Sequence, residues 1–372
     1  MKILFICGTF SPGKDGVGDY INKMSHALTK KGHEINIIAI RDKYCNELYK
    51  EIKSTENNLL TISCISKKVK LKKRFIYTQK IINEFNPDWI SLQFVPFGFN
   101  KKGIPFWLPN FINKLEGEFC LEIMFHELWI GRKIGIKNKL VSFLQETNIK
   151  NLLRKNKPKV IDTHLPVYFS NIEKLGYKPC RLPLFSNISP TKDIILNKKE
   201  NTFIWAFFSQ INITPKIINF INKINIELHE KGIISELIII GGEKTKNLKY
   251  KEIYKKLCPL FKTITITGFL DEKEISTLMQ HCDIGITPIP LHALGKSGTT
   301  AAFLAHGIPV AVPVISKGYT EENIGFFDSS VINSIITKAK LCNISKAKIA
   351  AENNKHKFDI DYVNSIFLQN LK

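Results

Sequence analysis

The rest of the chain is organised around the segment Asp283–Val314, which reads DIGITPIPLHALGKSGTTAAFLAHGIPVAVPV. Its apolar run Ile284–Thr287 is typical of a short buried strand, and a proline-rich loop follows it. The Ala-rich run Ala301–Ala305 predicts a helix. The run Val310–Val314, which follows a Gly-Ile-Pro turn, predicts a second strand. The order is therefore strand, loop, helix, turn and strand.

The loop residues GKSGTT, Gly295–Thr300, stand where that helix must begin. A helix start presents amide donors and the positive end of the helix dipole, so lysine, glycines and hydroxyls there favour a bound phosphate. The alternative is structural: Ser297 or Thr299 caps the helix, and Lys296 faces solvent. Six residues alone do not separate these two interpretations.

Length and charge limit the possible functions but do not identify one. The chain has 372 residues, which is too many for one ordinary core, so two domains are expected. Its 54 Lys and Arg against 33 Asp and Glu give a formal charge of +21. This charge favours anionic partners such as nucleotides, nucleic acid or an acidic membrane surface. A general bias toward Ile, Asn and Lys explains the same excess.

The cysteines and the apolar runs favour a reduced, cytosolic protein. Eight cysteines are scattered along the chain without a CxxC pair, which fits free thiols better than disulfides or a zinc site. The first residues, MKILFICGTFSPG, lead from a short apolar run into a glycine loop, so we interpret them as a strand and not an export signal. No apolar run is long enough to span a membrane.

The first half opens with a βαβ unit. A strand is expected at Ile3–Cys7, a helix at Ile21–Lys30 and a second strand at Ile35–Ile40. The connecting loop Gly13–Tyr20 is rich in glycine, and the missing Cβ atoms let backbone amides approach a ligand. Its spacing, G-x-x-G-x-G, is not the dinucleotide fingerprint, and no acidic residue ends the second strand as a ribose ligand. A nicotinamide enzyme is therefore disfavoured.

Histidines follow two later strands of this half. In an open parallel sheet, residues just past the carboxyl ends of the strands line the ligand crevice. His126 and Glu127 are therefore the best acid and base candidates, with a loop histidine that has no role as the alternative. For His164 the structural interpretation is preferred. The strands are expected at Leu59–Ile65, Trp89–Phe94, Leu121–Phe125 and Val160–Thr163.

Two basic segments, Lys67–Phe85 and Arg132–Lys159, interrupt the first half. The second places Ile136, Leu140 and Leu144 at helical spacing among lysines. A basic helix face of this kind can lie on anionic lipid, at about 1 kcal/mol per lysine close to the surface. A solvated helix packed on the sheet explains the pattern equally well.

The second half repeats the alternation of strands and helices after a polar linker at Ser186–Asn201. Asp271 begins one helix with Glu274 in its first turn, the pattern of a capping box. A helix is also expected near Ser330–Cys342. The tail Phe358–Lys372 is expected to be helical, with the apolar stripe Tyr362, Val363, Ile366, Phe367 and Leu371. Other expected elements are the strands Phe203–Phe208, Glu236–Ile240 and Ile264–Thr267 and the helices Ile217–Glu230 and Tyr250–Cys258.

The order of these motifs resembles that of the GT-B glycosyltransferases, and most of all the retaining, nucleotide-sugar-dependent group that builds bacterial polysaccharides and lipid-linked glycans. The resemblance covers nearly the whole chain. It rests on GVGDY after the first strand, PDWISLQF, the strand-end His126, LIIIGGE, ITGFLDEKEISTLMQHCDIGITPIP, GKSGTTAAFLAHGIPVAVP and FDIDYV. It implies an α/β fold of two Rossmann-like βαβ domains facing a central cleft, with a C-terminal helix that crosses back toward the N-terminal domain.

The resemblance also divides the chain and assigns roles to its residues. It implies an N-terminal acceptor domain over residues 1–188, a linker over 189–201, a nucleotide-sugar domain over 202–350, and a helix packing across both over 351–372. His126 would face the transferring sugar. The residues implied in donor binding are Gly16 and Gly18 at the diphosphate and sugar, Lys216 at the diphosphate, Gly268, Phe269 and Leu270 at the base, and Lys296, Ser297, Gly298 and Thr299 at the phosphates.

Three departures from the family pattern stand out. The strand after the linker ends in Ser209-Gln210 where the family has Gly-Arg. Leu294 and Ala302 occupy the places of the usual pair of glutamates, so recognition of the ribose must come from elsewhere and the donor stays open. Residues 359–361 read Asp-Ile-Asp and imitate a metal-binding DxD, but they lie at the start of the terminal helix, so no metal is expected.

The resulting expectation is a glycosyltransferase of the hexosyltransferase type. It would move a sugar from a nucleotide-diphosphate sugar to a glycan or lipid-linked acceptor, in polysaccharide, lipopolysaccharide or other glycoconjugate synthesis. The resemblance implies transfer with retention. No metal or other cofactor is expected, since preorganised amides and lysines stabilise the leaving diphosphate. If transfer inverts, Glu127, His126 or Asp19 is the candidate base. The expected location is cytoplasmic, with contact to the inner face of the membrane left open.

Other functions remain open at this point. A sugar-nucleotide epimerase is the alternative on the same fold. The charge leaves room for a nucleic-acid-binding or base-glycosylating protein, although the basic residues lack the interleaved aromatic residues that stack bases. A catalytically inactive partner subunit would explain the missing glutamates.

Overall fold

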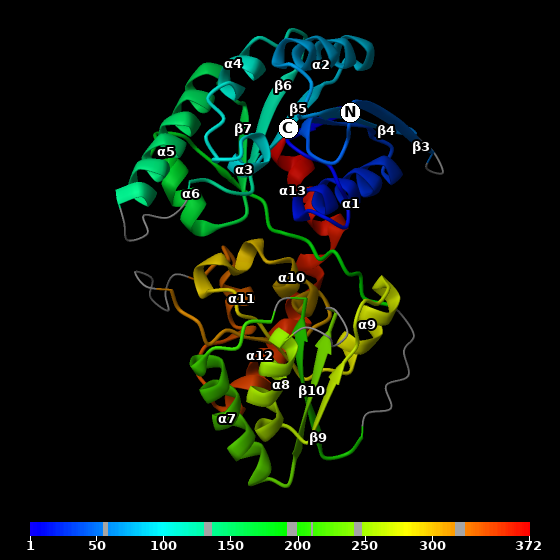
Figure 1. The fold of residues 1–372 in the computed structure, drawn as a ribbon. Helices are drawn as coiled ribbons and strands as arrows, with labels where there is room; N and C mark the ends of the chain where they lie inside the picture. Colours follow the sequence, from blue (N-terminus) through cyan, green and yellow to red (C-terminus); the bar gives the residue numbers. More distant parts are fainter. Residues whose placement is uncertain (55–58, 130–135, 192–198, 210, 242–247, 317–323) are drawn as a thin grey trace. The chain divides into compact units, whose positions relative to one another are not determined.

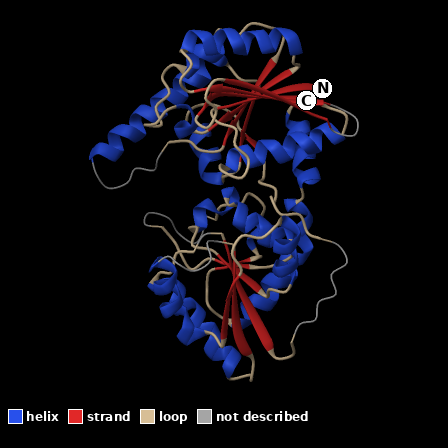
Figure 2. Cartoon of the chain, turned by 45° about the vertical axis from the view of Figure 1, so that its right-hand side comes forward, coloured by secondary structure: helices blue, strands red, loops and turns tan. Residues whose placement is uncertain are grey.

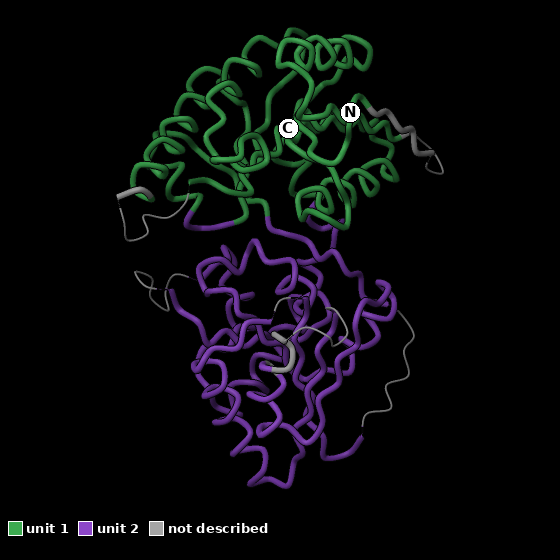
Figure 3. The backbone as a smooth tube through the Cα atoms, viewed as in Figure 1, with its two compact units in different colours: residues 1–164, 168–182, 364–372 green, residues 165–167, 183–363 purple. Residues whose placement is uncertain are grey.

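A computed structural model of the chain describes residues 1–54, 59–129, 136–191, 199–209, 211–241, 248–316 and 324–372. The chain forms two compact units, coloured separately in Figure 3. Unit 1 holds residues 1–164, 168–182 and 364–372, and unit 2 holds residues 165–167 and 183–363. Each unit is built around its own sheet, with helices on either side of the strands (Figures 1 and 2).

The sheet of unit 1 contains, in spatial order, β3 (Leu48–Ser54), β4 (Leu59–Ser66), β2 (Glu34–Asp42), β1 (Lys2–Cys7), β5 (Trp89–Phe94), β6 (Cys120–Phe125), β7 (Val160–Thr163) and β8 (Cys180–Arg181). Neighbouring strands are parallel except for β3, which runs antiparallel to β4 at the edge. The strand order reverses between β1 and β5. In open α/β sheets, such a switch point is where ligands bind, at the carboxyl ends of the strands.

The helices of unit 1 bury one face each. In α1 (Gly16–Lys30), Tyr20, Ile21, Met24 and Leu28 are buried and recur at helical spacing. The other helices are α2 (Leu71–Phe85), α3 (Pro96–Phe99), α4 (Leu108–Asn113), α5 (Ile136–Asn156) and α6 (Pro166–Glu173), and the end of α13 (Ile360–Asn370) also belongs to this unit.

The two faces of the unit 1 sheet differ in character. Side chains alternate between faces along each strand, so Leu92 of β5 points into the large apolar core while its neighbour Ser91 points to the other face. The pairing register places Phe5 of β1 next to Ser91 on that second face. The C-terminal helix α13 covers it, because Phe367 stacks on Phe5 with ring centroids 6.1 Å apart. The two ends of the chain thus lie side by side in this unit.

The sheet of unit 2 contains, in spatial order, β11 (Thr263–Ile266), β10 (Ile234–Ile240), β9 (Thr202–Phe208), β12 (Ile284–Ile286), β13 (Val310–Ala311) and β14 (Ile335–Ile336), all parallel. The strand order reverses between β9 and β12. Its helices are α7 (Pro215–His229), α8 (Leu248–Leu257), α9 (Glu272–Gln280), α10 (Gly298–Ala305), α11 (Ser329–Ile332) and α12 (Leu341–Asn354), with 3-10 turns η1 (Cys258–Leu260), η2 (Leu291–Lys296) and η3 (Lys355–Phe358).

The structure confirms the expected α/β class, with two Rossmann-like sheets and a C-terminal helix whose last residues return to unit 1. The capping box of α9 is also confirmed. The Asp271 side chain accepts a hydrogen bond from the Glu274 amide at 2.7 Å, and the Glu274 carboxylate accepts one from the Asp271 amide at 2.9 Å.

Three expected details are wrong. Residues 330–342 do not form one helix, because the β-branched pair Ile335–Ile336 forms β14 and pairs with β13; the amide of Val312 donates to the carbonyl of Ile336 at 2.9 Å. In α13, Tyr362 is 37% exposed, and Asn364 is buried in its place. Helix α1 also begins earlier than expected, at Gly16, because Asp15 caps it.

All eight cysteines are free thiols, as expected. Within the described part of the chain, we find no helix that is both long enough and apolar enough to cross a membrane. Residues 132–135 of the second basic segment, residues 192–198 of the expected linker, and Gln210 lie outside the described residues.

Candidate functional site

The loop before α10 is held by its own helix cap. Ser297 is the N-cap, and its Oγ accepts hydrogen bonds from the amide of Thr300 at 3.2 Å and from the hydroxyl of Thr300 at 3.0 Å. A helix leaves its first amides without intrahelical partners. Here the Ser297 hydroxyl oxygen accepts a hydrogen bond from the amide of Thr300. The amides of Gly298 and Thr299 precede that amide in the first turn of the helix. The capping role of Ser297 and an anion-binding role of the loop are therefore compatible.

This loop lies at the switch point of the unit 2 sheet. The hydroxyl of Thr299 donates to the carbonyl oxygen of Phe208, the last residue of β9, at 3.5 Å. Strand β9 pairs with β12, and the loop itself follows β12 in the chain. The start of α10 is thus placed where the strand order reverses, at the carboxyl ends of the strands, which is the ligand position of open α/β sheets.

Two predicted lysines stand at the same edge of this sheet. Lys296 ends η2 and is half-buried. Burial of His292 lowers the pKa of that side chain, and the positive charge of Lys296 lowers it further. Lys216 is exposed on the first turn of α7, which follows β9 and begins at the cap Thr214. Both positive side chains therefore follow strands of the switch point, on the side where an anion would bind.

The segment Gly268–Leu270 follows β11, further along the same sheet edge. Gly268 has a φ of +76° and forms an isolated bridge with Gly241, which follows β10. The hydroxyl oxygen of Thr267 accepts a hydrogen bond from the amide of Gly241 at 3.0 Å. The Phe269 side chain is 85% exposed, so it is open to contact with a ligand.

The two positions that carry glutamates in the resembling family belong here to the core of unit 2. Leu294 and Ala302 are each 1% exposed and pack in one apolar cluster. Neither side chain can accept a hydrogen bond from a ribose or sugar. These positions have therefore become part of the hydrophobic packing under the loop.

In unit 1, two carboxylate side chains of the chain itself accept hydrogen bonds from backbone amides at the start of α1. Asp15 accepts a hydrogen bond from the amide of Gly18 at 2.6 Å, and Asp19 accepts one from the amide of Gly13 at 2.6 Å. A Cβ atom on Gly18 would lie 2.9 Å from the Asp15 carboxylate, whereas a Cβ on Gly16 would meet open space. Gly18 is thus required by the packing of this turn, and Gly16 is the glycine with room beside it.

Around His126 the structure assembles a buried aromatic cluster. His126 follows β6 and is 8% exposed; its Nε2 lies 2.8 Å from Oε1 of Gln93 on β5. Its Nδ1 lies 3.3 Å from Nε2 of His164, which follows β7. Nδ1 of His164 lies 2.7 Å from the carbonyl oxygen of Leu182. Tyr20 of α1 packs edge-on against both imidazole rings, with centroids 4.9 and 5.5 Å away. Four elements therefore hold the histidine pair.

A buried pair of carboxyl groups lies on the same strands. Glu122 of β6 and Asp162 of β7 are fully buried and hydrogen-bond each other. Ser91 donates to Oε2 of Glu122 at 2.5 Å, and Asn370 of α13 donates to Oδ1 of Asp162 at 2.7 Å.

The burial of this pair controls its protonation. Burial raises the pKa of Asp162 to about 7, against the lowering effect of its hydrogen bonds with Asn370 and Glu122. Burial also raises the pKa of Glu122 well above its usual range, and the charge of Asp162 raises it further. Two adjacent buried carboxyl groups cannot both ionise without a large cost, so the pair shares a proton.

The structure places the predicted acid and base candidates in different surroundings. His126 joins the cluster, Glu127 follows it in a half-buried position, and Asp19 is engaged in the turn before α1. Sequence reasoning assigned His164 no role and did not single out Gln93 or the Glu122–Asp162 pair. A signal existed: polar residues recur at alternate positions within otherwise apolar strands, and such residues share one face of a sheet.

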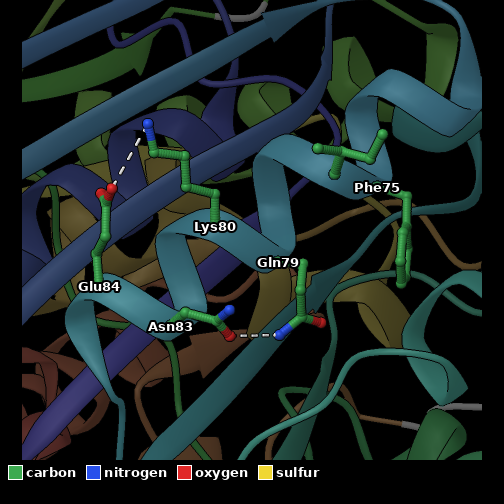
Figure 4. A pocket seen from close by; sticks show the side chains of 6 residues that line it. Phe75, Gln79, Lys80, Asn83 and Glu84 are labelled. Carbon is green, nitrogen blue, oxygen red and sulfur yellow. Dashed lines mark hydrogen bonds and ion pairs between the residues drawn. The ribbon is translucent and has the colours of Figure 1, made fainter.

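A separate hollow of about 470 Å³ lies along the outer side of α2 (Figure 4). It is lined by Phe75, Ile76, Gln79, Lys80, Asn83 and Glu84. Two pairs along its rim bond each other, Gln79 with Asn83 at 2.7 Å and Lys80 with Glu84 at 3.6 Å. None of the predicted site residues lines this hollow.

Comparison with known proteins identifies the fold. No protein-family model matches the sequence, and no curated protein matches it at the sequence level. Among solved structures, an alpha,alpha-trehalose-phosphate synthase (UDP-forming) from Burkholderia xenovorans, in complex with glucose-6-phosphate, is similar with a TM-score of 0.59 and 5% identity. The match covers 100% of this chain and 99% of that one.

Two further structures extend the comparison. WaaG, a glycosyltransferase involved in lipopolysaccharide biosynthesis, is similar with a TM-score of 0.57 and 13% identity over 99% of this chain and 98% of that one. A protein described as a UDP-N-acetylglucosamine 2-epimerase from Listeria monocytogenes reaches 0.51 and 14% identity, over 97% and 90%. The chain has the fold of the GT-B glycosyltransferases, which confirms the resemblance at the level of fold. Glycosyltransferases and an epimerase share this fold.

Proposed function

We propose that the protein is a glycosyltransferase of the hexosyltransferase type, which moves a sugar from a nucleotide-diphosphate sugar to a glycan or lipid-linked acceptor in envelope polysaccharide or glycoconjugate synthesis. One observation carries the proposal: the loop Lys296–Thr299 starts α10 at the switch point of the unit 2 sheet. A chain with a GT-B fold that places lysine and helix-start amides there is suited to bind a diphosphate.

The proposed chemistry depends on stabilising the leaving group. Negative charge develops on the nucleotide diphosphate as the glycosidic bond to it breaks, and preorganised donors near that charge lower the barrier. Lys216, Lys296 and the amides of Gly298 and Thr299 are the donors proposed for this role. The backbone of Gly268 and the segment up to Leu270 are proposed to meet the base. With these donors the transfer would need no metal.

His126 is proposed to position the sugar or to relay the acceptor proton. For transfer with retention, which we propose, no side chain has to act as a strong base. If the configuration inverts, His126 and Glu127 are the better candidate bases, because Asp19 already accepts a hydrogen bond within the turn before α1.

The variant Lys296→Ala tests the diphosphate site. Loss of a preorganised donor should lower turnover by about 100-fold or more, because such donors act on charge formed in the transition state. Lys262→Ala is the control, since Lys262 is an exposed lysine of the same unit that precedes β11 at the opposite edge of the sheet. Near-normal turnover of the Lys296 variant would refute the assignment.

The same assay separates the transferase from the epimerase. The donor is first found by a thermal-shift screen of nucleotide diphosphates and their sugars, since a ligand of the native state raises the apparent stability. A transferase then releases nucleotide diphosphate only when an acceptor takes the sugar, whereas an epimerase returns an altered nucleotide sugar without an acceptor. Full turnover in the presence of a chelator is expected for a reaction without metal.

We also propose a cytoplasmic protein that contacts the anionic inner face of the membrane through α2. The residues Lys67, Lys68, Lys70, Lys72 and Lys73 are exposed at the start of this helix. Ile76 on the same helix is 54% exposed, next to the hollow of Figure 4. Arg74 does not contribute to this face, because it is buried and its guanidinium donates to the carbonyls of Lys67 and Val69. Exposed lysines around an apolar side chain are typical of such contacts.

A further inference from the structure

A half-buried arginine lies at the carboxyl edge of the unit 1 sheet. Arg41 is the second-last residue of β2, and its backbone amide donates to the carbonyl oxygen of Gly8, which follows β1, at 3.0 Å. Its Nη1 donates to the carbonyl oxygen of Gly98 in α3 at 3.5 Å. In the sheet β1 lies between β2 and β5, and α3 follows β5 in the chain. The Arg41 side chain therefore extends from β2 past the end of β1, to the switch point where the strand order reverses.

Close packing at the end of β1 fixes the group that Arg41 contacts. A Cβ atom on Gly8 would lie 2.6 Å from the carbonyl carbon and oxygen of Gly98, which is closer than a real side chain allows. Glycine at this position lets α3 approach the end of β1 so closely. The Gly98 carbonyl, and with it the Arg41 guanidinium, is thereby held at the carboxyl edge, where open α/β sheets bind ligands.

No carboxylate pairs with Arg41 in the described part of the chain. A guanidinium carries several N–H donors, and the hydrogen bond to Gly98 is the one that this guanidinium makes among those residues. Burial lowers the pKa of Arg74, and the charge of Arg41 lowers it further, so two positive charges lie near each other. The adjacent Asp42 is buried, and its carboxylate accepts hydrogen bonds from backbone amides. A bound anion would offset the repulsion between the two guanidinium groups.

The exposed charges at this edge are mainly positive. Three exposed lysines follow neighbouring strands: Lys14 after β1, Lys43 after β2 and Lys67 after β4. The Nζ atoms of Lys14 and Lys43 lie over the ring of Tyr44, 5.1 and 4.8 Å from its centroid. The acids Asp15 and Asp19 are half-buried, and each accepts a hydrogen bond from a backbone amide. An approaching anion therefore meets cationic side chains first.

We propose that Arg41 binds an anionic group, a phosphate or a carboxylate, on the acceptor of the transfer reaction. The planar guanidinium presents paired N–H groups that match two oxygens of such a group. Arg41 and His126 belong to the ends of strands on either side of the switch point, so both can contact one acceptor. The proposal rests on the proposed function for the identity of the ligand, and it narrows the acceptor to an anionic one. The structural alternative is that Arg41 only ties β2 to α3.

The test observes Arg41 directly by NMR. The free, full-length protein is labelled with ¹⁵N in arginine and titrated at constant ionic strength with glucose 6-phosphate, glucuronate or uncharged glucose. The signals missing from Arg41→Gln and Arg154→Gln identify the two side chains. The Nε signal of Arg41 should shift to saturation with at least one of the two anions and not with glucose, and the two titrations distinguish phosphate from carboxylate. Arg154, exposed on α5 of the same unit, is the control whose signal should not saturate.

Calorimetry with the anion that binds measures the contribution of the guanidinium. Arg41→Gln should weaken binding by about 10-fold or more, because hydrogen bonds between charged groups are strong. Arg41→Lys keeps the charge but lacks the paired N–H groups, so it should lose less. Lys296→Ala should bind this anion as the unsubstituted protein does, since Lys296 belongs to unit 2. Circular dichroism checks that the variants fold.

Several results would overturn the proposal: an Arg41 signal that does not saturate, equal shifts with glucose, or undiminished binding in Arg41→Gln. The proposal also fails if none of the sugars binds while Arg41→Gln lowers sedimentation with phosphatidylglycerol vesicles, because the anion is then a lipid headgroup. No donor is present in these experiments. Failure to detect glycosyl transfer would therefore refute the proposed function and leave the result at Arg41 standing.

Discussion

Ser209 is one residue at which this chain differs from the family that it resembles. It directly follows β9 with a φ of +62°, in the left-handed region, and its amide donates to the carbonyl of Ile240 at 3.0 Å. The family has glycine at this place, and glycine adopts this conformation without the steric cost of a Cβ atom. A non-glycine residue there costs about 1 kcal/mol.

The variant Ser209→Gly should therefore be more stable than the natural chain, by about 0.5 to 1 kcal/mol in the free energy of unfolding. The gain is partly offset by the greater freedom of glycine in the unfolded chain. Urea unfolding measures the difference. The control Ser63→Gly, in the middle of β4, should lower stability, because strand conformation gives glycine no advantage. A loss of stability in both variants would contradict the strain at Ser209.

Among the helices and strands, the sequence predicted correctly those features that depend only on residues close together in the chain. The capping box of Asp271 and Glu274 needs only neighbours in the chain, and it was found as expected. Strand β14 was missed because its formation depends on pairing with β13. The meeting of Glu122 with Asp162 was missed for the same reason: the register of β6 and β7 brings them to one face, and a helix from the end of the chain covers them.

Helix α2 carries a prediction of its own. If its basic, partly apolar face contacts the membrane, Ile76→Ser should lower the fraction of protein that sediments with vesicles rich in phosphatidylglycerol. Ile226→Ser is the control, because Ile226 is 52% exposed on α7 of the other unit and should not matter. Binding should also weaken with added salt, which screens the lysines. Equal binding to neutral phosphatidylcholine vesicles, or equal losses in the two variants, would contradict the proposal.

At the scale of the whole molecule, the two units keep their polar groups in different places. Unit 2 presents lysines and helix-start amides at the carboxyl edge of its sheet. Unit 1 places an acidic pair, an amide and two histidines within the layer between its sheet and the helices that cover it. Sequence patterns revealed the first set because it lies in a loop with an unusual composition. They did not reveal the second, since each of its members is a single polar residue in an apolar strand or at a strand end.

The buried acidic pair makes the stability of the protein depend on pH. In the unfolded chain Asp162 and Glu122 ionise near their ordinary pKa values of about 4. In the folded chain the pKa of Asp162 is about 7, and that of Glu122 is raised well above its usual range. Between about pH 4 and pH 7 the folded state therefore binds more protons than the unfolded state. The free energy of unfolding falls as the pH rises through this range. The steepest contribution is about 1.4 kcal/mol per pH unit for one proton.

Replacing the pair by neutral amides, with Glu122→Gln and Asp162→Asn together, should remove this loss. Urea midpoints measured from about pH 4 to 8 should then show a smaller decline with pH than in the natural chain, with the native fold checked by circular dichroism. The matched control replaces two exposed acids, Glu118→Gln and Asp361→Asn, and removes the same number of carboxyl groups. Because exposed side chains are in contact with water in the folded as in the unfolded chain, the control should retain the decline. A decline of equal slope in all three proteins would show that the pair does not hold its proton in the folded state.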